Sequence, residues 1–598
     1  MKRAVFDIFG KLKGEIQDFD SKGLYIVGKP ATANEKIERG GVRGGYFFSQ
    51  KQTLESIDLA CASKYRRGIF DEEGQRKTFL NIVNFYRDVM KMKININVSN
   101  YILEPWSLDF TWIVWLFDRM FKRWAAMESY DDLIDEYAND LSTYGTTVSK
   151  KIAKCPERVP LRTLRNTQTA KSLYAAASSG GYAIIENDFH YNDMEEYPDW
   201  DTDGLSPDKS YTVFERYGLV PERLVKKYAG MSIQQICTYK PKENEKMVLA
   251  LAILIAEGAD EKEGVSSRKV LFMEKLDEDT WPLEECHINR QDGRWLGIGE
   301  PEKQLENQIS RNLDSNLRRR GILWATKKIF QSSDDNVQKN LVMEVSDGEV
   351  LHVKRDGNIT QVNTASQHSA EITADENSIK ENSQQISFAF EVATGESLPS
   401  NTPFRLGVIL QASVAQHFSQ VRETFSNFLK RAFFDQIVPS FREEYEDEHE
   451  AIVGLGESDI EAFKEEIIIY HTNMRIWDAV RAGKRVDPAL IRAAVEEELA
   501  RNAYAFINVP EKYYEHAEYY MKLNLTEDIS SDIAELTTIW SDLNAKGDPR
   551  AEHVLKLIMA KRGKALPAVL GPRMAVPPVQ DPNAPPAPVQ RPTEAVPV

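Results

Sequence analysis

The fold of this chain is decided in the stretch Trp295-Leu-Gly297-Ile-Gly299-Glu-Pro301-Glu-Lys-Gln-Leu305. The paired glycines predict a turn. Neither they nor Gly454-Leu-Gly456 are followed by the third glycine of a dinucleotide-binding fingerprint. Pro301 suits the first position of a helix, and good helix formers follow it up to Arg320, where Gly321 is expected to end the helix. A tight turn that starts a long helix is therefore predicted.

Strand patterns flank this turn on both sides. The pairs Asp347-Gly348 and Asp356-Gly357 lie between alternating segments and predict a three-stranded meander, because Asp-Gly is a strong hairpin signal. Runs rich in apolar and β-branched residues predict a small β region before the turn. The predicted strands are 248–255, 269–273 and 281–288 before the turn, and 341–345, 350–354 and 359–362 after it.

The first third of the chain is predicted to be mostly helical. Apolar residues recur every three or four positions over 79–92, which predicts a helix with one buried face. Alternation over 94–98 then predicts a half-buried strand. A second helical stretch, 111–144, is expected to break where Ser129 caps a new helix and to stop at Gly145. Further on, 221–228 is predicted to be a short helix.

Helices are predicted to dominate the last third. Thr402 and Pro403 cap and open a long helix whose apolar stripe runs from Leu406 to Leu429, before Pro439. The polar stretch 363–377 is predicted to be a loop that leads into a helix near 379–392. Five further helices are expected: from the capping box at Ser458 to Gly483, from Asp487-Pro488 onward, and over 513–523, 532–543 and 551–561.

The C-terminal end differs in composition from the rest. Ten of the 26 prolines fall within 567–598, where apolar residues are too sparse for a core, so an extended or disordered tail is predicted. The whole chain has 598 residues, of which 42% are hydrophobic and 28% charged, the usual mix of a folded protein with a sizeable core.

Charge and cysteine content exclude several classes of protein. With 75 Lys and Arg against 92 Asp and Glu, the net charge is −17, which disfavours a protein that coats nucleic acid. The four cysteines form no Cys-x-x-Cys pair, as expected in a reducing cytoplasm. No apolar run reaches the roughly 18 residues of a membrane span, and the N-terminus does not resemble a signal peptide. No membrane role is expected.

Motifs of common enzymes are absent from the sequence. It contains no phosphate-binding Gly-x-x-x-x-Gly-Lys-Ser/Thr, no Gly-x-Ser-x-Gly and no His-Glu-x-x-His. The segment Asp199-Trp-Asp201-Thr-Asp203-Gly204 begins like a calcium loop. Its twelfth position is Ser210 in place of Glu, which favours a solvated acidic loop. Zinc binding by Cys237, Cys286 and His287 is also disfavoured, because buried inert cysteine is commoner.

A basic band on this acidic chain is a candidate for contact with DNA. One interpretation of Arg318-Arg319-Arg320 is that these cations stabilise the C-terminal end of a helix. The other is that they contact phosphates without base specificity. The DNA-channel candidates are Arg311, Arg318, Arg319, Arg320, Lys327 and Lys328.

An ordered series of short patterns resembles the portal proteins of tailed bacteriophages. No single pattern is diagnostic, and their order along the chain carries the resemblance. The most similar one is the Trp295–Leu305 stretch continued by Gln308, Asn312 and Asn316. The others are Asn81-Ile-Val-Asn-Phe-Tyr-Arg-Asp-Val-Met with the following 94–98, Asp140-Leu-Ser-Thr-Tyr-Gly-Thr, Phe214-Glu-Arg-Tyr-Gly-Leu-Val-Pro-Glu-Arg-Leu and Thr394-Gly-Glu-Ser-Leu-Pro-Ser-Asn-Thr-Pro.

The resemblance implies a ring of identical subunits, usually twelve, at one vertex of the capsid in the virion. Double-stranded DNA would pass through the ring without sequence-specific contacts, pumped in by a separate terminase and later ejected. The other implied partners are the major capsid protein and a head–tail adaptor, with assembly in the host cytoplasm. No catalysis, cofactor or metal is implied. This fits a net acidic wall with few basic groups, along which phosphates can slide.

The implied fold class is α+β, a portal-like subunit with a mixed wing domain, stem helices, a small β clip and a helical C-terminal crown. The tunnel loop is expected at 363–377. The expected segments are an N-terminal arm at 1–19, the wing at 20–211 and 326–400, the stem at 212–232 and 300–325, the clip at 233–299, the crown at 401–566 and the Pro-rich tail at 567–598.

Two other functions remain open from the sequence. One is a metal-dependent enzyme, with nucleic acid as one conceivable substrate, that uses Asp199, Asp201 and Asp203. The other is a scaffold or adaptor that forms no ring and whose proline-rich tail binds aromatic grooves of a partner. Metal-binding calorimetry would test the first and a measurement of particle mass the second.

Overall fold

The computed structural model describes most of the chain between residues 5 and 501 and short pieces beyond. The chain divides into two units, 1–525 and 526–598. In the second unit only 536–541 and 554–555 are described, and both are helical, within the helices expected there. The described residues are 5–21, 24–26, 29–30, 46–65, 68–70, 76–105, 111–152, 155–243, 245–256, 268–326, 329–332, 359–362, 369–387, 404–439, 457–483, 487–501, 519–523, 536–541 and 554–555.

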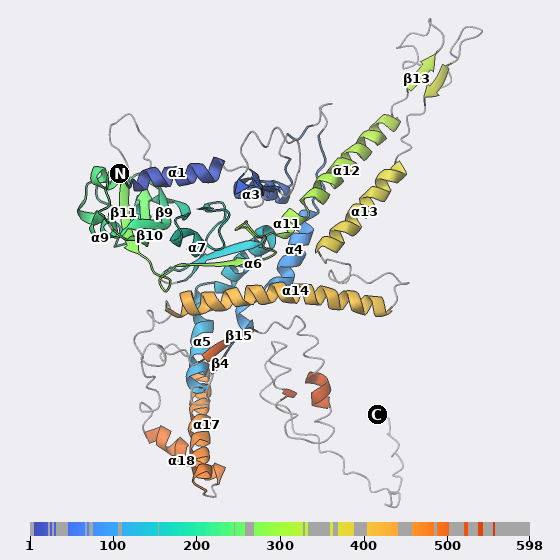
Figure 1. Ribbon diagram of the computed structural model, residues 1–598. Coiled ribbons are helices and arrows are strands. Elements are labelled where there is room, and N and C mark those ends of the chain that lie inside the picture. The colour runs from blue at the N-terminus through green and yellow to red at the C-terminus, as the bar shows by residue number, and fades with distance from the viewer. Residues whose placement is uncertain are drawn as a thin grey trace, which may run out of the picture. The chain divides into compact units, whose positions relative to one another are not determined.

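The first unit is mixed α+β, as the sequence predicts, and its strands pair in antiparallel fashion. Among the described residues, the largest sheet has five strands in the order β11-β10-β9-β8-β7 (Figure 1). Their bounds are Leu164–Asn166 for β7, Tyr182–His190 for β8, Ser210–Pro221 for β9, Met247–Ile255 for β10 and Lys269–Lys275 for β11. The strands predicted at 248–255 and 269–273 are therefore confirmed.

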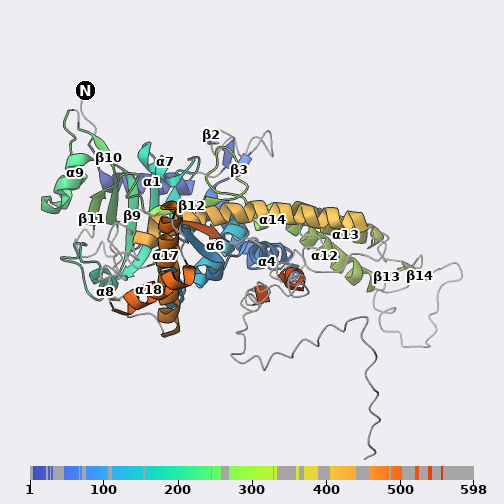
Figure 2. The same cartoon turned by 90° about the horizontal axis from the view of Figure 1, so that it is seen from below.

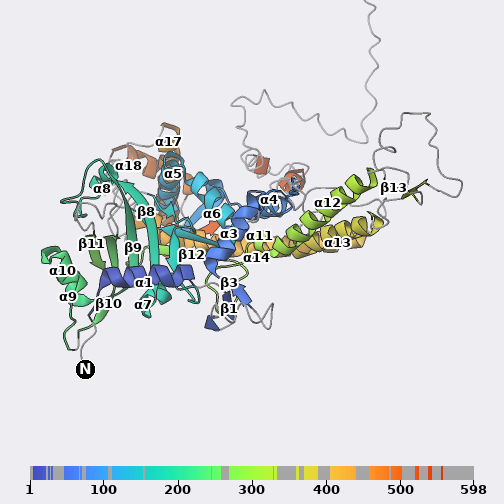
Figure 3. The same cartoon turned by 90° about the horizontal axis from the view of Figure 1, so that it is seen from above.

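Both faces of this sheet are buried. Side chains alternate along β8, so that Tyr182 and Ile184 belong to one apolar cluster while Ala183 and Ile185 belong to another. Three helices, α1 (Ile8–Ser21), α9 (Glu222–Lys227) and α10 (Ile233–Cys237), supply apolar residues to the first cluster, and α7 (Leu173–Ser178) packs on the other face (Figure 3). Leu54 of α3 (Gln50–Cys61) joins the second cluster from the side.

The helix α1 is part of this packing, although the sequence suggests only an N-terminal arm. Ile8 and Leu12 are fully buried against the sheet. Glu15 also forms a two-pronged ion pair with Arg216, a side chain only 1% exposed, in which Arg216 Nε and Nη2 each donate at 2.7 Å. The N-terminus therefore contributes to the folding of the sheet.

A second, smaller sheet has the order β12-β5-β6, formed by Leu283–His287, Thr146–Lys150 and Glu157–Arg158. The expected clip, 233–299, thus supplies strands to two sheets whose other strands come from earlier in the chain. The expected stem segment 212–232 consists mostly of β9 and the short α9, followed by the 3₁₀ turn Tyr228–Gly230.

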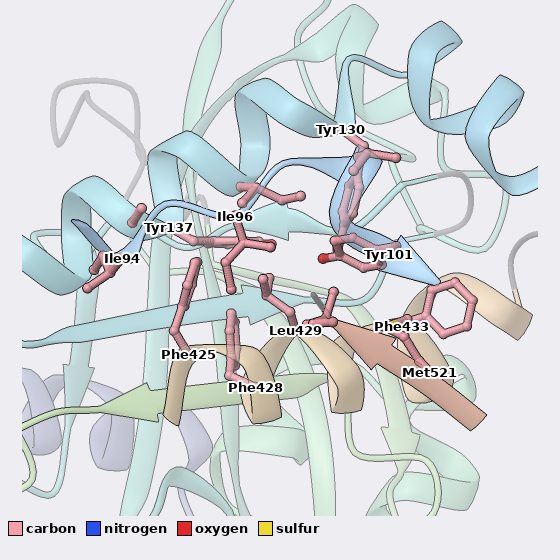
Figure 4. Close-up of a cluster of buried hydrophobic side chains, with 14 of the residues drawn as sticks. Ile94, Ile96, Tyr101, Tyr130, Tyr137, Phe425, Phe428, Leu429, Phe433 and Met521 are labelled. Carbon is pink, nitrogen blue, oxygen red and sulfur yellow. The ribbon is translucent and has the colours of Figure 1, made fainter. Parts of the chain in front are cut away.

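A large aromatic-rich core joins segments that are far apart in the sequence. It is built from α4 (Val83–Ile94), α5 (Thr111–Met127), α6 (Tyr130–Tyr144), α14 (Phe404–Ala432) and α17 (Glu457–Arg481), together with β4 (Tyr101–Pro105) and β15 (Tyr519–Leu523). Figure 4 shows Phe425, Phe428 and Leu429 of α14 beneath Tyr137 of α6. Residues of the expected crown therefore share one core with residues of the expected wing.

The helix predictions are mostly confirmed. The stretch 111–144 does break into α5 and α6, and Gly145 ends α6 in a left-handed conformation. The long helix α14 is present, whereas its expected cap at 402–403 lies outside the described residues, and a π-helical turn, Phe433–Ile437, extends it. The helix α18 (Pro488–Arg501) begins as predicted, with Ala489 N–H donating to Asp487 Oδ1 at 3.0 Å. Viewed from below, α18 lies beside the end of α17 (Figure 2).

Three local predictions are wrong. The segment 94–98 is no strand, because the N–H groups of Ile96 and Val98 donate to side chains of Asn95 and Asp131 and so need no partner strand. Ser129 does not cap α6, since its backbone is left-handed. Ser458 is no cap either, because α17 already begins at Glu457.

The helix predicted over 513–523 is also wrong where the structure describes it. Residues Tyr519–Leu523 form β15, which pairs with β4. Met521 and Leu523 are buried, two residues apart, in the aromatic core. The free edge of β4 supplies the backbone partner that a local pattern cannot reveal.

Candidate functional site: a helical arm

The glycine turn Gly297-Ile298-Gly299 packs backbone to backbone on the end of α6. A Cβ atom on Gly297 would lie 2.1 Å from the carbonyl oxygen of Gly145, too close for any side chain. Gly145 has a φ of 72° and donates its own N–H to Leu141. Ile288 N–H then donates to the Gly145 carbonyl at 2.9 Å. The turn predicted from the sequence is thus confirmed and fixes where the next helices begin.

A buried polar junction follows the turn. The helix α11 (Glu300–Lys303) places the carboxylate of Glu300, 1% exposed, between Lys303 Nζ at 2.6 Å and the hydroxyl of Ser387 at 2.7 Å. Gln304 Nε2 donates to the carbonyl of Ser383 and the hydroxyl of Ser387. Because burying these groups unpaired would be costly, the bonds tie the start of one helix firmly to the end of another.

Those two helices form an arm. The helix α12 (Leu305–Thr326) runs away from the junction, and α13 (Ser369–Ser387) returns beside it (Figures 1 and 3). Asn382 Nδ2 donates to Asn307 Oδ1 at 3.1 Å near the junction, and Arg318 pairs with Glu376 at 2.9 Å farther out. The pairs show that the helices are antiparallel. We call α12 and α13 the helical arm.

A two-stranded ribbon lies at the outer end of the arm. It pairs β13 (Ile329–Ser332) with β14 (Ile359–Val362). The strand predicted at 359–362 is confirmed, whereas its partners predicted at 341–345 and 350–354 lie outside the described residues. The predicted loop 363–377 is wrong over 369–377, which form the first half of α13. Ile372, Ile379 and Ile386 recur there every seven residues, a helical spacing.

One face of α12 carries side-chain amides spaced by four residues, at Gln308, Asn312 and Asn316, which we call the amide ladder. Each binds the backbone of the segment 78–82, which precedes α4. The N–H groups that donate to these side chains are those of Ile82 to Gln308 at 2.8 Å, Leu80 to Asn312 at 2.9 Å and Thr78 to Asn316 at 2.9 Å. Gln308 Nε2 also donates to the Leu80 carbonyl at 2.6 Å.

The amide ladder takes the place of a neighbouring strand, because its side chains bind backbone N–H and C=O groups of 78–82 that have no strand partner. Its residues belong to the pattern that carries the resemblance, but nothing in the sequence indicates a partner for them. The four-residue spacing of polar amides in an expected helix is the available signal, because residues at i and i+4 share one face.

A second face of α12, about 100° around the helix from the amide ladder, is apolar and exposed. Ile309, Leu313 and Leu317 are 53%, 58% and 44% exposed, whereas Gln308 and Asn312 are 1% and 5% exposed. The helix therefore buries amides and exposes aliphatic side chains, the reverse of the usual arrangement in a surface helix. We call Ile309, Leu313 and Leu317 the outer stripe.

The basic band predicted from the sequence lies on α12, but much of it is engaged within the chain. Arg318 is paired with Glu376, and Arg319 donates to the hydroxyl of Thr78. Arg311 is partly buried, and its charge opposes the rise that burial causes in the pKa of Tyr86. Arg320 is partly exposed. Lys327 and Lys328 lie outside the described residues.

The arm as a whole is not basic. The two helices together carry five Lys or Arg and six Asp or Glu side chains. Partial burial raises the pKa of Asp314, and the charges of Asp375 and Glu376 raise it further. The alternative interpretation, that the arginines cap a helix end, is wrong, because α12 continues through Gly321 to Thr326. One glycine inside a helix costs only about 1 kcal/mol.

The acidic loop that resembles a calcium site is occupied by a lysine of the chain. Lys269 Nζ lies 2.7 Å from Asp201 Oδ1 and also donates to the carbonyl of Asp203. The same Asp201 oxygen accepts the N–H of Asp203 at 3.2 Å. Across the described part of the chain, no three His, Cys, Asp or Glu side chains are grouped so that they could hold a metal ion.

The candidate zinc ligands lie apart. Cys286 is buried in the aromatic core, where burial raises the pKa of its thiol to about 12, while Cys237 packs beside α1. His287 is close to Thr146, with Nδ1 and Oγ1 3.0 Å apart, and to Glu285 at 3.5 Å. Thr146, His287 and Glu285 are arranged like a hydroxyl nucleophile with its base. Thr146 is fully buried, however, and its hydroxyl accepts the N–H of Gly297, so these contacts stabilise the glycine turn.

Comparison with protein-family models finds no match to this chain, and comparison with curated proteins finds no match either. Within the described residues, no helix has the length and apolar character needed to cross a bilayer.

Proposed function

We propose that this chain is a portal subunit, which assembles as a closed ring and forms a passive channel for double-stranded DNA at one vertex of a phage capsid. Packaging would be driven by a separate terminase, and the same channel would release the genome. Contacts with the major capsid protein and a head–tail adaptor belong to this proposal, as does a location in the virion.

The observation that carries the proposal is the position of the most similar sequence pattern. The stretch Trp295–Leu305 with Gln308, Asn312 and Asn316 resembles the turn and stem helix of portal proteins. In the structure this stretch is the base of the helical arm, with the glycine turn packed on α6 and the amide ladder bound to 78–82. The residues of the pattern therefore lie together at the base of the helical arm, where the glycine turn and the amide ladder fix the start of α12.

The proposal places the stem and the clip differently from the sequence. The two helices of a stem must lie side by side along their length. The helix that lies beside α12 is α13. Residues 212–221, the expected first part of the stem, belong instead to the strand β9. We therefore assign the stem to α12 and α13. The clip is assigned to the ribbon β13–β14 between them, in place of 233–299. The first wing segment, the crown and the Pro-rich tail keep their expected assignment within the proposal, whereas the second wing segment, 326–400, gives up β13, β14 and α13 to the clip and the stem.

The charge of the arm is compatible with a channel that lets DNA slide. A wall with many unpaired cations would hold phosphates tightly, since each neutralised phosphate releases counterions and adds to affinity. Here Arg318 is already paired with a carboxylate, and acidic side chains outnumber basic ones on the two helices. We expect only weak, salt-sensitive contact with duplex DNA.

The purified full-length chain tests the proposal directly. Mass photometry should show one assembly of about twelve chain masses, and negative-stain images should show a ring with a central opening. A single-chain mass at micromolar concentration, with no ring in the images, would refute it. Incubation with ATP should give no hydrolysis, because the proposal assigns the motor to another protein.

Neither alternative function gains support from a specific observation. For a metal-dependent enzyme, Asp201 would have to release Lys269 before it could bind a cation. The basis for a scaffold that forms no ring is the tail 567–598, which lies outside the described residues. Mass photometry separates a scaffold from a ring, and calorimetry with Mg²⁺, Mn²⁺ or Ca²⁺ tests the acidic loop.

A further inference from the structure

The helical arm contributes to none of the apolar cores of the protein. Buried apolar side chains gather in four clusters, and no residue of α12 or α13 that the structure describes belongs to one of them or packs on one. Ile379 of α13 is buried, but outside these clusters, and the outer stripe of α12 is exposed. Burial of apolar surface, worth roughly 25 cal/mol for each Å², therefore does little to hold the arm in place.

Polar contacts attach the arm to the rest of the chain. The amide ladder binds 78–82, and Asn316 Nδ2 also donates to the hydroxyl of Tyr65 at 3.2 Å. Arg319 donates to the hydroxyl of Thr78. Such bonds add only modestly to stability, because both partners bind water once the bond is broken.

Water has access to the segment that the amide ladder binds. Leu80 is 38% exposed, and Thr78 and Ile82 are partly exposed. If the arm moved away, water could bind the three backbone N–H groups and the amides of Gln308 and Asn312. No polar group would then remain unpaired, so detachment of the arm carries no large desolvation cost.

The base of the arm offers a place about which it can turn. The helical path is interrupted at Gln304, between α11 and α12. On one side of this break α11 packs against α3, α4 and α6 of the body. On the other side α12 and α13 are joined by side-chain contacts near the junction and farther out. A rotation at Gln304 would therefore carry both helices together.

We infer that the helical arm is a mobile unit, which detaches from 78–82 as one body and turns about Gln304 while its helices and the rest of the chain stay folded. Regions with few buried apolar contacts open at a much lower free energy than the core of the same protein. Because detachment exposes little apolar surface, it should also depend little on denaturant. The inference does not rest on the proposed ring, since every contact in it lies within one chain.

Native-state hydrogen exchange of the full-length protein, in rising urea below the unfolding transition, tests the inference. The amides of 78–82 should exchange through an opening whose free energy barely changes with urea. Those of β10 should exchange through an opening whose free energy falls steeply with urea, as in global unfolding. The amides in the middle of α12 should exchange more slowly than those of 78–82, because the helix keeps its own backbone bonds.

Two results would overturn the inference. If 78–82 exchanges as slowly as β10, the arm does not detach from the body. If α12 loses protection together with 78–82, the arm separates by unfolding and not by movement as a unit. Mass photometry of the same sample decides the ring proposal separately.

A matched pair of variants tests whether the arm moves as a unit. Asn316→Ala removes the partner of Thr78 N–H. It should also speed exchange at Leu80 and Ile82, whose own acceptors remain, by about two- to tenfold for one lost hydrogen bond. The control is Asn382→Ala, which removes a bond within the arm and should leave exchange at 78–82 unchanged. Faster exchange at Thr78 alone would show that the rungs open independently, and the inference would be wrong.

Discussion

Asn312 of α12 accepts the N–H of Leu80 at a distance of 2.9 Å, across 232 residues of sequence. Leu80 lies in a segment with neither helical nor strand pairing of its own, and Asn312 is 5% exposed. The bond is the middle rung of the amide ladder, with Gln308 and Asn316 on either side. Side-chain amides of α12 therefore bind the backbone of 78–82 and hold the base of the arm to that segment.

Replacing Asn312 with Ala should destabilise the chain by about 0.5–1.5 kcal/mol, because the N–H of Leu80 then loses its acceptor. Hydrogen exchange of a peptide that covers 78–82 should become faster than in the wild type. The matched control is Asn377→Ala, an exposed asparagine of α13, for which we expect a change within about 0.5 kcal/mol. Unchanged exchange at 78–82 in Asn312→Ala would show that the ladder does not hold the segment.

Gly297→Ala should be among the most damaging single substitutions in the chain. The added methyl group would meet the Gly145 carbonyl oxygen at 2.1 Å, and both partners are backbone, so neither can turn aside. We expect a loss of at least about 1–3 kcal/mol in the free energy of unfolding, as found for overpacked cores. Gly230→Ala is the control, because a methyl group added there would have nothing within 4 Å. Equal melting temperatures for the two variants would contradict the close approach.

Local elements can be predicted well from the sequence and their partners poorly. The glycine turn, the break between α5 and α6 and the strand β10 follow from residue types and spacings within a few positions. The pattern over 513–523 predicts a helix where β15 forms, since the partner strand β4 lies more than 400 residues earlier. The pairing of α12 with α13 escapes prediction for the same reason: 369–377 has few apolar residues, and its helix depends on contacts such as that of Glu376 with Arg318.

The candidate site shows the same limit. The arginines of α12 are recognisable in the sequence as a basic band, but composition cannot show that Arg318 already has Glu376 as a partner. Gln308, Asn312 and Asn316 belong to a recognisable pattern, whereas their role depends on a distant backbone segment. Side-chain spacing can predict which residues share a helix face, and only the tertiary structure shows what each face contacts.

The ion pair of Arg216 and Glu15 predicts that α1 is needed for stability. Glu15→Ala leaves the guanidinium of Arg216 buried without its carboxylate, and removal of one partner of a buried pair costs about 3–5 kcal/mol. The control is Asp20→Ala, also in α1, which breaks an exposed pair with Lys51 worth about 0–1 kcal/mol. Urea unfolding of both variants measures the difference. Similar losses in the two would indicate that the Arg216 pair does not anchor the helix.

Stability should also depend on pH through Asp140 of α6. Burial raises the pKa of this carboxyl from 3.8 to about 7, although Arg158 lies 3.4 Å away and opposes the rise. A raised pKa means that the folded state favours the protonated form. The resulting stabilisation is complete below about pH 4 and is lost as the pH rises through about 7, and its size is at most about 4 kcal/mol at roughly 1.36 kcal/mol per pKa unit.

Asp140→Asn mimics the protonated carboxyl at every pH. Its free energy of unfolding should therefore exceed that of the wild type at about pH 8, by an amount that shrinks as the pH is lowered and vanishes near about pH 4. Asp132→Asn, an exposed carboxylate in the first turn of α6, should show no such trend. Urea titrations at about pH 4, 6 and 8 measure the three proteins. If Asp140→Asn is instead less stable than the wild type at the highest of these pH values, the ion pair with Arg158 outweighs the burial of the charge.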